Sequence, residues 1–279
     1  PDVVFGIGVY ETLYALLPSK KHHARLVFCD HGALINQWHD KRLRVMRLLD
    51  SFFSDRTVVL TPSNAKDYQS KLRTPRRKLL VIPNSIPNGF VQKKASMETK
   101  RIIWAGRLSP EKGVDFLIEI AKRVLPSRPD WSWDVYGELD SSLSFDPSKR
   151  VRDAGIEEQL LFKGRANDMS KIYPNYSIGC LTSYREGFSL FLLESRAYGL
   201  VPMSFEVAHG PSSLISDGKS GFLIKPFDID AYAQKLSLLM DNENLRGEMS
   251  SKALEGLEKY SEDEIIKQWE SLIEELDKK

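Results

Sequence analysis

The segment SYREGFSLFLLE, residues 183–194, joins a predicted strand to a predicted helix. The apolar run just before it, residues 178–181, is typical of a strand buried in a parallel sheet. A helical pattern then starts near Ser189. At the start of a helix the backbone N–H groups are unpaired, and the helix dipole favours a bound anion. Because two carboxylates, Glu186 and Glu194, flank this position, we interpret the segment as the donor site of an enzyme that handles a phosphorylated sugar.

The composition of the chain is that of an ordinary folded protein. Its 279 residues are enough for two domains or for one large domain. The formal net charge of +2 gives no indication of a nucleic-acid partner. One local cluster is basic, and it consists of Lys71, Arg73, Arg76, Arg77 and Lys78. We expect a solvated helix end and loop there, and the alternative is contact with an anionic membrane surface or a phosphorylated acceptor.

Cysteine usage and hydropathy indicate a reducing compartment. Cys29 and Cys180 both lie in apolar runs, so we expect buried free thiols and no disulfide. No apolar run reaches the length that spans a membrane, and no signal peptide is visible. We therefore expect a cytoplasmic protein, with peripheral attachment to the cytoplasmic face of the membrane as a further option. The sequence opens on Pro1 and not on Met, from which we expect a fragment or a truncated chain.

Strands and helices alternate along residues 1–90, a pattern that predicts parallel βα units. The predicted strands are residues 3–9, 26–29, 57–60 and 79–82. The predicted helices are residues 10–17, closed by Pro18, then 40–53, and then 63–72 with Ser63 as N-cap. Residues 84–100 contain Pro87, Gly89 and several charged side chains, and they are the best linker in the chain.

The alternation resumes after the linker, and we expect a second domain over residues 91–260. Its predicted strands are residues 101–105, 132–136, 160–163, 178–182, 201–204 and 222–224. Its predicted helices are residues 113–125, 147–154, 168–173, 189–198, 211–216 and 229–239. Residues 261–279 contain one more helix, which opens with a capping box of Ser261 and Glu264 and carries an apolar stripe. We expect this stripe to pack on the same chain, and the alternative is that it packs on a partner protein.

A loop between a predicted strand and a predicted helix carries two candidate phosphate ligands. Arg107 and Lys112 lie in the segment Gly106–Gly113, at the carboxyl end of a strand, where open α/β sheets bind ligands. Arginine offers a planar fork to phosphate oxygens, and lysine offers a compact charge. Two solvated surface cations are the simpler alternative.

Two histidines occupy similar positions after predicted strands. His31 follows the run 25–29, and His209 precedes a Gly-Pro turn. Each is either a ligand contact or an ordinary turn histidine. The sequence has no Cys/His metal spacing, no H-E-x-x-H, no G-x-S-x-G, no Walker loop and no complete G-x-G-x-x-G, so we expect neither a metal nor a bound cofactor.

Four motifs, in order, resemble the retaining GT-B glycosyltransferases of the family-four type, also called glycosyl transferases group 1. These are Pro83-Asn84, the Gly106-Arg107…Lys112-Gly113 loop, the Glu186…Glu194 pair, and Asp217-Gly-Lys-Ser-Gly221-Phe-Leu-Ile. The segment from Gly210 to Gly218 is most similar to bacterial enzymes that glycosylate teichoic acid or other surface glycans. The resemblance implies an α/β fold of two Rossmann-like domains, with parallel sheets facing a cleft that binds a nucleotide sugar.

The resemblance also implies roles for particular residues. Arg107 and Lys112 would neutralise the diphosphate, and Glu194 would hold the ribose. His31 would lie near the C6 hydroxyl of the donor sugar, and the nucleobase would lie near Gly137 or Arg165. The sugar and phosphates would be held by Glu186 and by the backbone of Gly187, Phe188, Ser189 and Leu190.

The implied reaction moves a sugar, with retention, from a nucleotide sugar to an acceptor. We expect a UDP-sugar as donor and a glycan, glycolipid or polyol-phosphate acceptor in bacterial cell-surface polysaccharide biosynthesis. In the family, residues 1–90 would belong to the acceptor-binding first domain, here shortened, and helix 261–279 would cross back to it. A non-catalytic partner subunit and a phosphorylase on the same fold are the alternatives, although no pyridoxal-phosphate lysine motif is visible.

Overall fold

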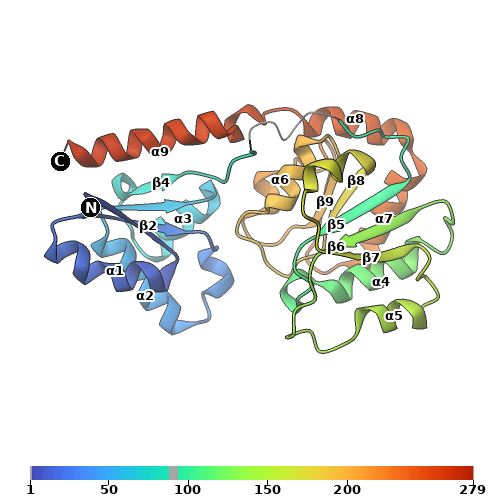
Figure 1. Cartoon of the computed structure of the whole chain (residues 1–279), viewed down its shortest axis with the longest axis horizontal. Coiled ribbons are helices and arrows are strands. Elements are labelled where there is room, and N and C mark those ends of the chain that lie inside the picture. The colour runs from blue at the N-terminus through green and yellow to red at the C-terminus, as the bar shows by residue number, and fades with distance from the viewer. Residues whose placement is uncertain (1, 88–93, 279) are drawn as a thin grey trace.

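The computed structural model describes residues 2–87 and 94–278, and it contains two parallel sheets side by side (Figure 1). The first sheet has the order β1-β2-β3-β4 and the second the order β10-β9-β8-β5-β6-β7. We call residues 2–87 with the last helix the first unit, and residues 94–260 the second unit. Residues 88–93 of the predicted linker 84–100, which include Gly89, lie outside the described residues.

The first sheet has its strands in chain order, each paired in parallel with the next. They are β1 (Val3–Ile7), β2 (Arg25–Asp30), β3 (Arg56–Val59) and β4 (Leu79–Val81). The helices that connect them are α1 (Val9–Lys21), α2 (Lys41–Phe53) and α3 (Pro62–Lys71). Side chains alternate between the faces of a strand. Phe28 therefore packs against Tyr68 of α3, whereas Val27 and Cys29 face the opposite side.

The last helix, α9 (Glu262–Asp277), covers that opposite side of the first sheet, as the red ribbon in Figure 1 shows. Ser261 caps it by accepting a hydrogen bond from the Glu264 N–H, which confirms the predicted N-cap. The Ser261 N–H donates to the Glu258 carbonyl at 3.0 Å and not to the Glu264 side chain, so the predicted capping box is only half formed. Its apolar stripe buries Ile265, Leu272 and Leu276 against the sheet. The chain therefore runs from the first sheet into the second unit and returns.

The second unit is a six-stranded parallel sheet with helices on both faces. Its strands are β5 (Arg101–Ala105), β6 (Ser132–Tyr136), β7 (Leu160–Gly164), β8 (Ile178–Leu181), β9 (Val201–Phe205) and β10 (Phe222–Ile224). Its helices are α4 (Val114–Val124), α5 (Pro147–Asp153), α6 (Leu190–Ala197), α7 (Ile229–Asp241) and α8 (Glu243–Ala253). The strand order reverses between β5 and β8. The carboxyl ends of the strands at such a reversal are where doubly wound sheets bind ligands.

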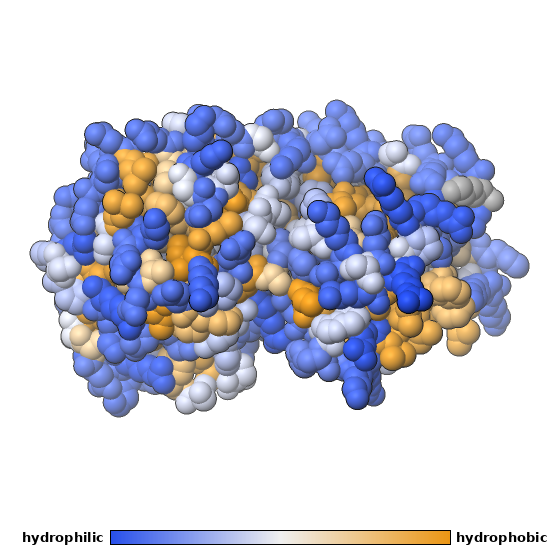
Figure 2. All heavy atoms as spheres, turned by 180° about the vertical axis from the view of Figure 1, so that it is seen from behind, coloured by the Kyte–Doolittle hydropathy of each residue, from blue (hydrophilic) through white to orange (hydrophobic). Residues whose placement is uncertain are grey.

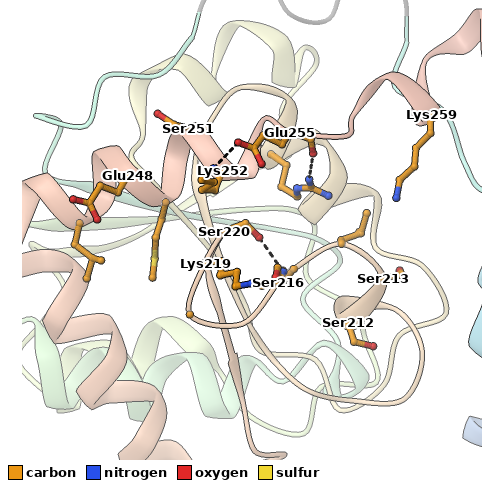
Figure 3. Close-up of a pocket in the computed structure, with 16 residues that line it drawn as sticks. Ser212, Ser213, Ser216, Lys219, Ser220, Glu248, Ser251, Lys252, Glu255 and Lys259 are labelled. Atoms are coloured by element: carbon orange, nitrogen blue, oxygen red, sulfur yellow. Dashed lines mark hydrogen bonds and ion pairs between the residues drawn. The ribbon is translucent and has the colours of Figure 1, made fainter.

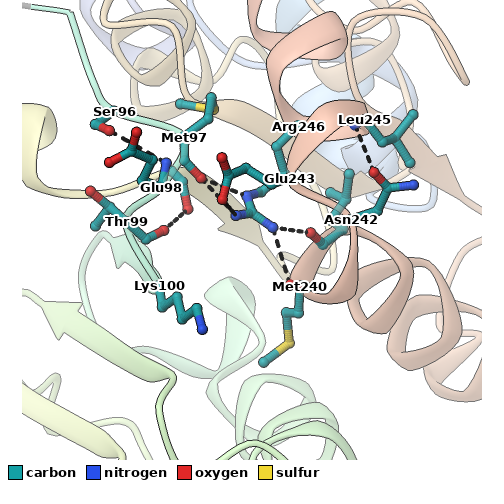
Figure 4. A network of polar contacts seen from close by, with 12 residues as sticks. Ser96, Met97, Glu98, Thr99, Lys100, Met240, Asn242, Glu243, Leu245 and Arg246 are labelled. Atoms are coloured by element: carbon teal, nitrogen blue, oxygen red, sulfur yellow. Dashed lines mark hydrogen bonds and ion pairs between the residues drawn. The ribbon is translucent and has the colours of Figure 1, made fainter.

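A buried arginine fastens the start of the second unit to its helices (Figure 4). Arg246 of α8 is 1% exposed and donates to the carbonyl oxygens of Met97, Leu239 and Met240. Charge-assisted bonds to these carbonyls satisfy the buried cation, and Glu243 Oε2 lies 3.9 Å from its Nη2. The segment after the linker is thereby held against the end of α7.

Several predicted elements differ from the structure. Helix α1 runs through Pro18 to Lys21, because a proline near a helix end removes only one backbone hydrogen bond. Thr61, not Ser63, caps α3, and Pro62 takes the first helical position. The predicted helices 168–173 and 211–216 are short 3-10 turns. Helix α8 was missed because few of its side chains are apolar, and its buried face includes Arg246.

The predicted thiols and basic cluster can also be compared with the structure. Cys29 and Cys180 are buried and free, as expected, and burial raises the pKa of Cys29 to about 12. The basic cluster is exposed except at Lys78, whose Nζ donates to the carbonyls of Phe52 and Ser54 at the end of α2. Burial lowers the pKa of Lys78.

None of the helices in the described residues has the length and apolar character that a bilayer crossing requires.

Apolar side chains are exposed on the outer faces of α1 and α2, which lie side by side. Figure 2 shows such orange groups at the surface of the first unit, on the right of that view. Leu17 is 80% exposed and Tyr14 78% exposed, and the others on these helices are Tyr10, Val45, Leu48, Leu49, Phe52 and Phe53. A grouped apolar surface is typical of a face that meets another surface.

Asp50 of α2 is fully buried, and its carboxyl oxygens have no hydrogen-bond partner among the described residues. Burial raises the pKa of Asp50 to about 7, and the charge of Asp30 adds to the effect, whereas Arg47 opposes it. In the unfolded chain an aspartate loses its proton at about pH 4. The folded state therefore binds more protons than the unfolded state between about pH 4 and pH 7, and stability falls as pH rises through this interval.

We expect Asp50→Asn to raise the free energy of unfolding at pH 8 and to change it little at pH 4, because the amide cannot ionise. Urea unfolding at both pH values measures this. Asp153→Asn is the control, since the Asp153 side chain is 60% exposed. An equal effect of Asp50→Asn at both pH values would contradict the assignment of a neutral buried carboxyl.

Candidate active site

The loop between β8 and α6 brings a buried carboxylate to the carboxyl edge of the second sheet. Glu186 is 6% exposed, and its Oε1 accepts hydrogen bonds from Lys112 Nζ and from Ser183 Oγ, both at 2.7 Å. Lys112 ends the 3-10 turn Pro110–Lys112 that follows β5. The predicted loop cation and the predicted loop carboxylate are thus an ion pair at the β5/β8 reversal. Ser183, which had no predicted role, donates the second hydrogen bond to the carboxylate.

Gly113 allows these two loops to meet. It has φ +66°, and a Cβ there would lie 2.0 Å from the carbonyl oxygen of Thr182. Thr182 Oγ1 in turn donates to the Lys112 carbonyl at 3.2 Å and accepts from Trp104 Nε1 at 3.1 Å. Only glycine combines this backbone conformation with this close approach.

The start of α6 contains the other predicted backbone ligands. Ser189 caps the helix and accepts from the Leu192 N–H at 3.3 Å, so the helix begins at Leu190. Leu190 is 47% exposed, whereas the ring of Phe188 is buried against Tyr260. Phe188 can therefore offer a ligand only its backbone, because its side chain belongs to the core.

Residues of the first unit contact this loop directly. Asn36 Nδ2 donates to the Glu186 carbonyl at 3.1 Å, and a Cβ on Gly187 would lie 2.8 Å from the His31 carbonyl oxygen. The His31 side chain is exposed on the turn after β2, so the contact with Gly187 involves its backbone. His31 and the Glu186 loop thus lie together, from opposite units.

A buried ionic network holds the turn that carries His31. Asp30 accepts from Arg47 Nε at 2.9 Å, from the Tyr68 hydroxyl at 2.6 Å and from the Gly32 N–H at 3.0 Å. Both Arg47 and Asp30 are about 2% exposed. Such a carboxylate is stabilised because its charge is paired and its lone pairs are satisfied. The network comes from β2, α2 and α3, and sequence spacing alone could not bring these residues together.

His209 forms a second contact between the units. Its Nε2 lies 2.6 Å from Asp67 Oδ2 of α3, and its backbone forms an isolated bridge with Glu186. Its backbone is left-handed, with φ 77°, a conformation that costs free energy in a residue other than glycine. The predicted histidine is therefore next to the Glu186 loop, and its partner Asp67 had no signal in the sequence.

Glu194, one residue beyond the first turn of α6, is half-buried and accepts a hydrogen bond from the Tyr173 hydroxyl at 2.7 Å. Burial raises the pKa of Glu194, and the hydrogen bond from Tyr173 opposes that rise. A desolvated carboxylate of this kind gains from any further hydroxyl donor.

Arg107 and Arg165 are not part of the Lys112–Glu186 cluster. The Arg107 side chain is 72% exposed and lies 3.3 Å from Asp140, and that of Arg165 is 74% exposed and lies 3.5 Å from Glu138. Arg165 and Gly137 line a cavity of about 300 Å³ between the end of β6 and the end of β7. The two residues predicted at the nucleobase are thus neighbours.

A larger groove, of about 1190 Å³, lies between the segment 212–220 and α8 (Figure 3). Its walls carry serine hydroxyls and Lys219, Lys252 and Lys259, with Lys252 paired to Glu255 at 2.8 Å. None of the predicted site residues lines it. Within residues 2–87 and 94–278 no cluster of three or more His, Cys, Asp or Glu side chains could hold a metal ion.

Two facing parallel sheets with this ligand edge are the GT-B fold of glycosyltransferases. The solved structure of the pneumococcal O-GlcNAc transferase GtfA, in complex with UDP and GlcNAc, superposes with a TM-score of 0.80 at 24% identity. The match covers 94% of this chain and 54% of that one. At this identity the likeness establishes the fold, as the sequence resemblance predicted.

The chain belongs to the family of glycosyl transferases group 1, whose sequence model matches residues 86–255. An exopolysaccharide phosphotransferase of Streptomyces coelicolor is 32% identical over 80% of this chain and 23% of its own length. A poly(ribitol-phosphate) alpha-N-acetylglucosaminyltransferase of Staphylococcus aureus is 31% identical over 63% of this chain and 36% of its own length. The chain thus spans well under half of either relative.

We expect Gly187→Ala to lower the thermal midpoint of unfolding, because the added Cβ would force the Glu186 loop away from the His31 carbonyl. Gly247→Ala is the matched control. Gly247 lies inside α8 with no heavy atom within 4 Å of an added Cβ, so alanine there favours the helix. Equal midpoints for the two variants would show that the units do not approach each other at Gly187.

Proposed function

We propose that this chain carries the donor site of a retaining glycosyltransferase that uses a nucleoside-diphosphate sugar, with UDP as the nucleotide. The observation that carries the proposal is the Lys112–Glu186 ion pair at the start of α6, which the first unit contacts through Asn36. A cation, a carboxylate and free helix-end amides at one place suit a ligand that has both phosphates and hydroxyls.

The proposed donor lies across this edge of the second sheet. Lys112 binds the diphosphate, and the exposed Arg107 side chain turns towards it from the same loop. Glu186, with the backbone of residues 187–190, binds the sugar, and Glu194 binds the ribose hydroxyls. The nucleobase occupies the cavity at Gly137 and Arg165, and the His31 ring contacts the C6 hydroxyl. The support for these roles is the proximity of the loops and the match of each group to its ligand.

The proposed chemistry is stabilisation of the leaving nucleotide. As the bond to the anomeric carbon breaks, negative charge grows on the β-phosphate, and a preorganised cation and backbone N–H groups lower the barrier. Lys112 supplies the positive charge, and the amides at the start of α6 supply the N–H groups. The proposed reaction uses neither a metal nor a cofactor. Retention means that the acceptor hydroxyl ends on the face that the nucleotide left.

For the acceptor we propose a glycan, a glycolipid or a polyol phosphate in bacterial cell-surface polysaccharide biosynthesis. The support is the activity of the relatives, one of which is a poly(ribitol-phosphate) alpha-N-acetylglucosaminyltransferase. A non-catalytic donor-binding subunit is the rival. Turnover separates the two, because only an enzyme releases UDP from a UDP-sugar.

We expect UDP to raise the thermal midpoint of unfolding, with GDP and ADP raising it less, because a ligand stabilises only the state that binds it. Lys112→Ala should abolish this shift and the slow release of UDP from UDP-N-acetylglucosamine and UDP-glucose. Lys171→Ala is the control, since the Lys171 side chain is 83% exposed. No shift with any of the three nucleotides would reject the donor site, and a shift without turnover would favour the rival.

We also propose that the first unit contacts the inner membrane surface peripherally. The support is the exposed basic cluster, which includes Arg76 and Arg77, together with the apolar surface of α1 and α2. Basic residues near an anionic leaflet each contribute about 1 kcal/mol, and exposed aromatic and aliphatic side chains add apolar contact.

We expect cosedimentation with phosphatidylglycerol vesicles and not with phosphatidylcholine vesicles. The double variant Arg76→Glu, Arg77→Glu should weaken this binding more than about tenfold, since it reverses two charges. The matched control is Lys149→Glu, Arg152→Glu, which makes the same change of charge on α5 of the second unit. Equal binding of the two double variants to the vesicles would show that the basic cluster does not contribute to the membrane contact.

A further inference from the structure

A cavity of about 580 Å³ opens beside the candidate active site. Pro110 and Glu111, which line it, immediately precede Lys112, and Tyr184 and Arg185 immediately precede Glu186. The Tyr184 N–H donates to the Glu111 carbonyl at 2.9 Å, so the two walls are tied together. Adjacent Cα atoms are about 3.8 Å apart, which places the Cα atoms of these four residues within about 8 Å of the Cα atom of Lys112 or Glu186.

One wall of the cavity is a partly exposed aromatic ring that packs against two other rings. The Tyr184 ring is 39% exposed and packs against Phe116 at 4.6 Å and Phe227 at 5.2 Å between centroids. Phe145 lies in another wall, with the Arg150 guanidinium 3.7 Å from its ring centroid. A fixed, partly exposed ring offers a flat apolar surface at little entropic cost, and the C–H face of a pyranose ring matches such a surface.

The polar groups of the cavity balance one another. Glu111 pairs with Arg185 at 3.2 Å, and Asp115 accepts from the Tyr184 hydroxyl at 2.8 Å. With Arg150, the lining carries two carboxylates and two guanidinium groups. Their charges cancel, which disfavours a phosphate polymer as the occupant. A lining that has both donors and acceptors beside an aromatic ring suits a ligand with many hydroxyl groups and no charge.

We propose that this cavity is a subsite for a neutral saccharide, which holds sugar units of the acceptor glycan beside the donor site. Its role in catalysis rests on the proposed function, whereas saccharide binding as such does not. The ring of Tyr184 carries the apolar face of one sugar unit, and Glu111, Asp115 and Arg150 bind its hydroxyls. The subsite belongs to the second unit, so it would bind sugar units of the glycan in addition to those that the acceptor-binding first unit holds.

Saturation-transfer NMR with maltotetraose, cellotetraose and chitotetraose tests the subsite. We expect at least one of the three to bind saturably, and Tyr184→Ala to weaken that binding about tenfold, through loss of the stacking surface. Tyr14→Ala removes an equally large but more exposed tyrosine from α1, and it should bind as the unchanged protein does. Phe145→Leu keeps an apolar group and loses the second ring, so it should also weaken saccharide binding. This variant tests the subsite if Tyr184→Ala does not fold.

The UDP-induced thermal shift, measured on the same variants, separates this proposal from the proposed function. We expect Tyr184→Ala and Phe145→Leu to keep the shift. A chain that binds a saccharide through Tyr184 but shows no shift with UDP retains the subsite and loses the donor site. The subsite is rejected if none of the three oligosaccharides binds, or if the Tyr184, Phe145 and Tyr14 variants all bind equally.

Discussion

The burial of the Glu186 carboxylate is the constraint on which the candidate active site depends. An ionised group that is 6% exposed needs a partner of opposite charge and further hydrogen bonds. Lys112 and Ser183 meet this need, and in doing so they tie the loop after β5 to the loop after β8. Both loops start at the reversal of strand order between β5 and β8. The ion pair therefore fixes the two loops relative to each other at the position where doubly wound sheets bind ligands.

The first unit completes the site through different forces. The Asp30–Arg47–Tyr68 network makes the turn after β2 rigid, and the Asn36 and His209–Asp67 contacts bring that turn to the Glu186 loop. These contacts are polar and partly exposed, and each is worth little by itself. Their common effect is positional, because they fix the His31 backbone opposite Gly187.

Local patterns predicted most of the strands, because a buried parallel strand is a continuous apolar run whatever its partners are. The motif residues Lys112, Glu186 and Gly187 could be singled out in the same way, since loop composition and order are visible in the sequence. The contacts of Asn36 and Asp67 could not, because they depend on how the two units meet. The bond from Ser183 to Glu186 is local, but nothing in the sequence distinguished that serine from other loop serines. Helix α8 was missed for a related reason: Arg246 is buried partly by bonding to the carbonyl of Met97, which is 149 positions away in the sequence.

The return of α9 to the first sheet bears on synthesis at the ribosome. The strands of that sheet are complete at Val81, yet the helix that covers one of its faces begins at Glu262. At about 5 to 20 residues per second, the 180 residues between them (82 to 261) take roughly 9 to 36 seconds to synthesise. During this time Val27, Cys29 and Val58 lack their final cover. The nascent chain therefore passes through a stage in which the first sheet, although synthesised before the second unit, still has one face uncovered, and in which a chaperone has an apolar sheet face to bind.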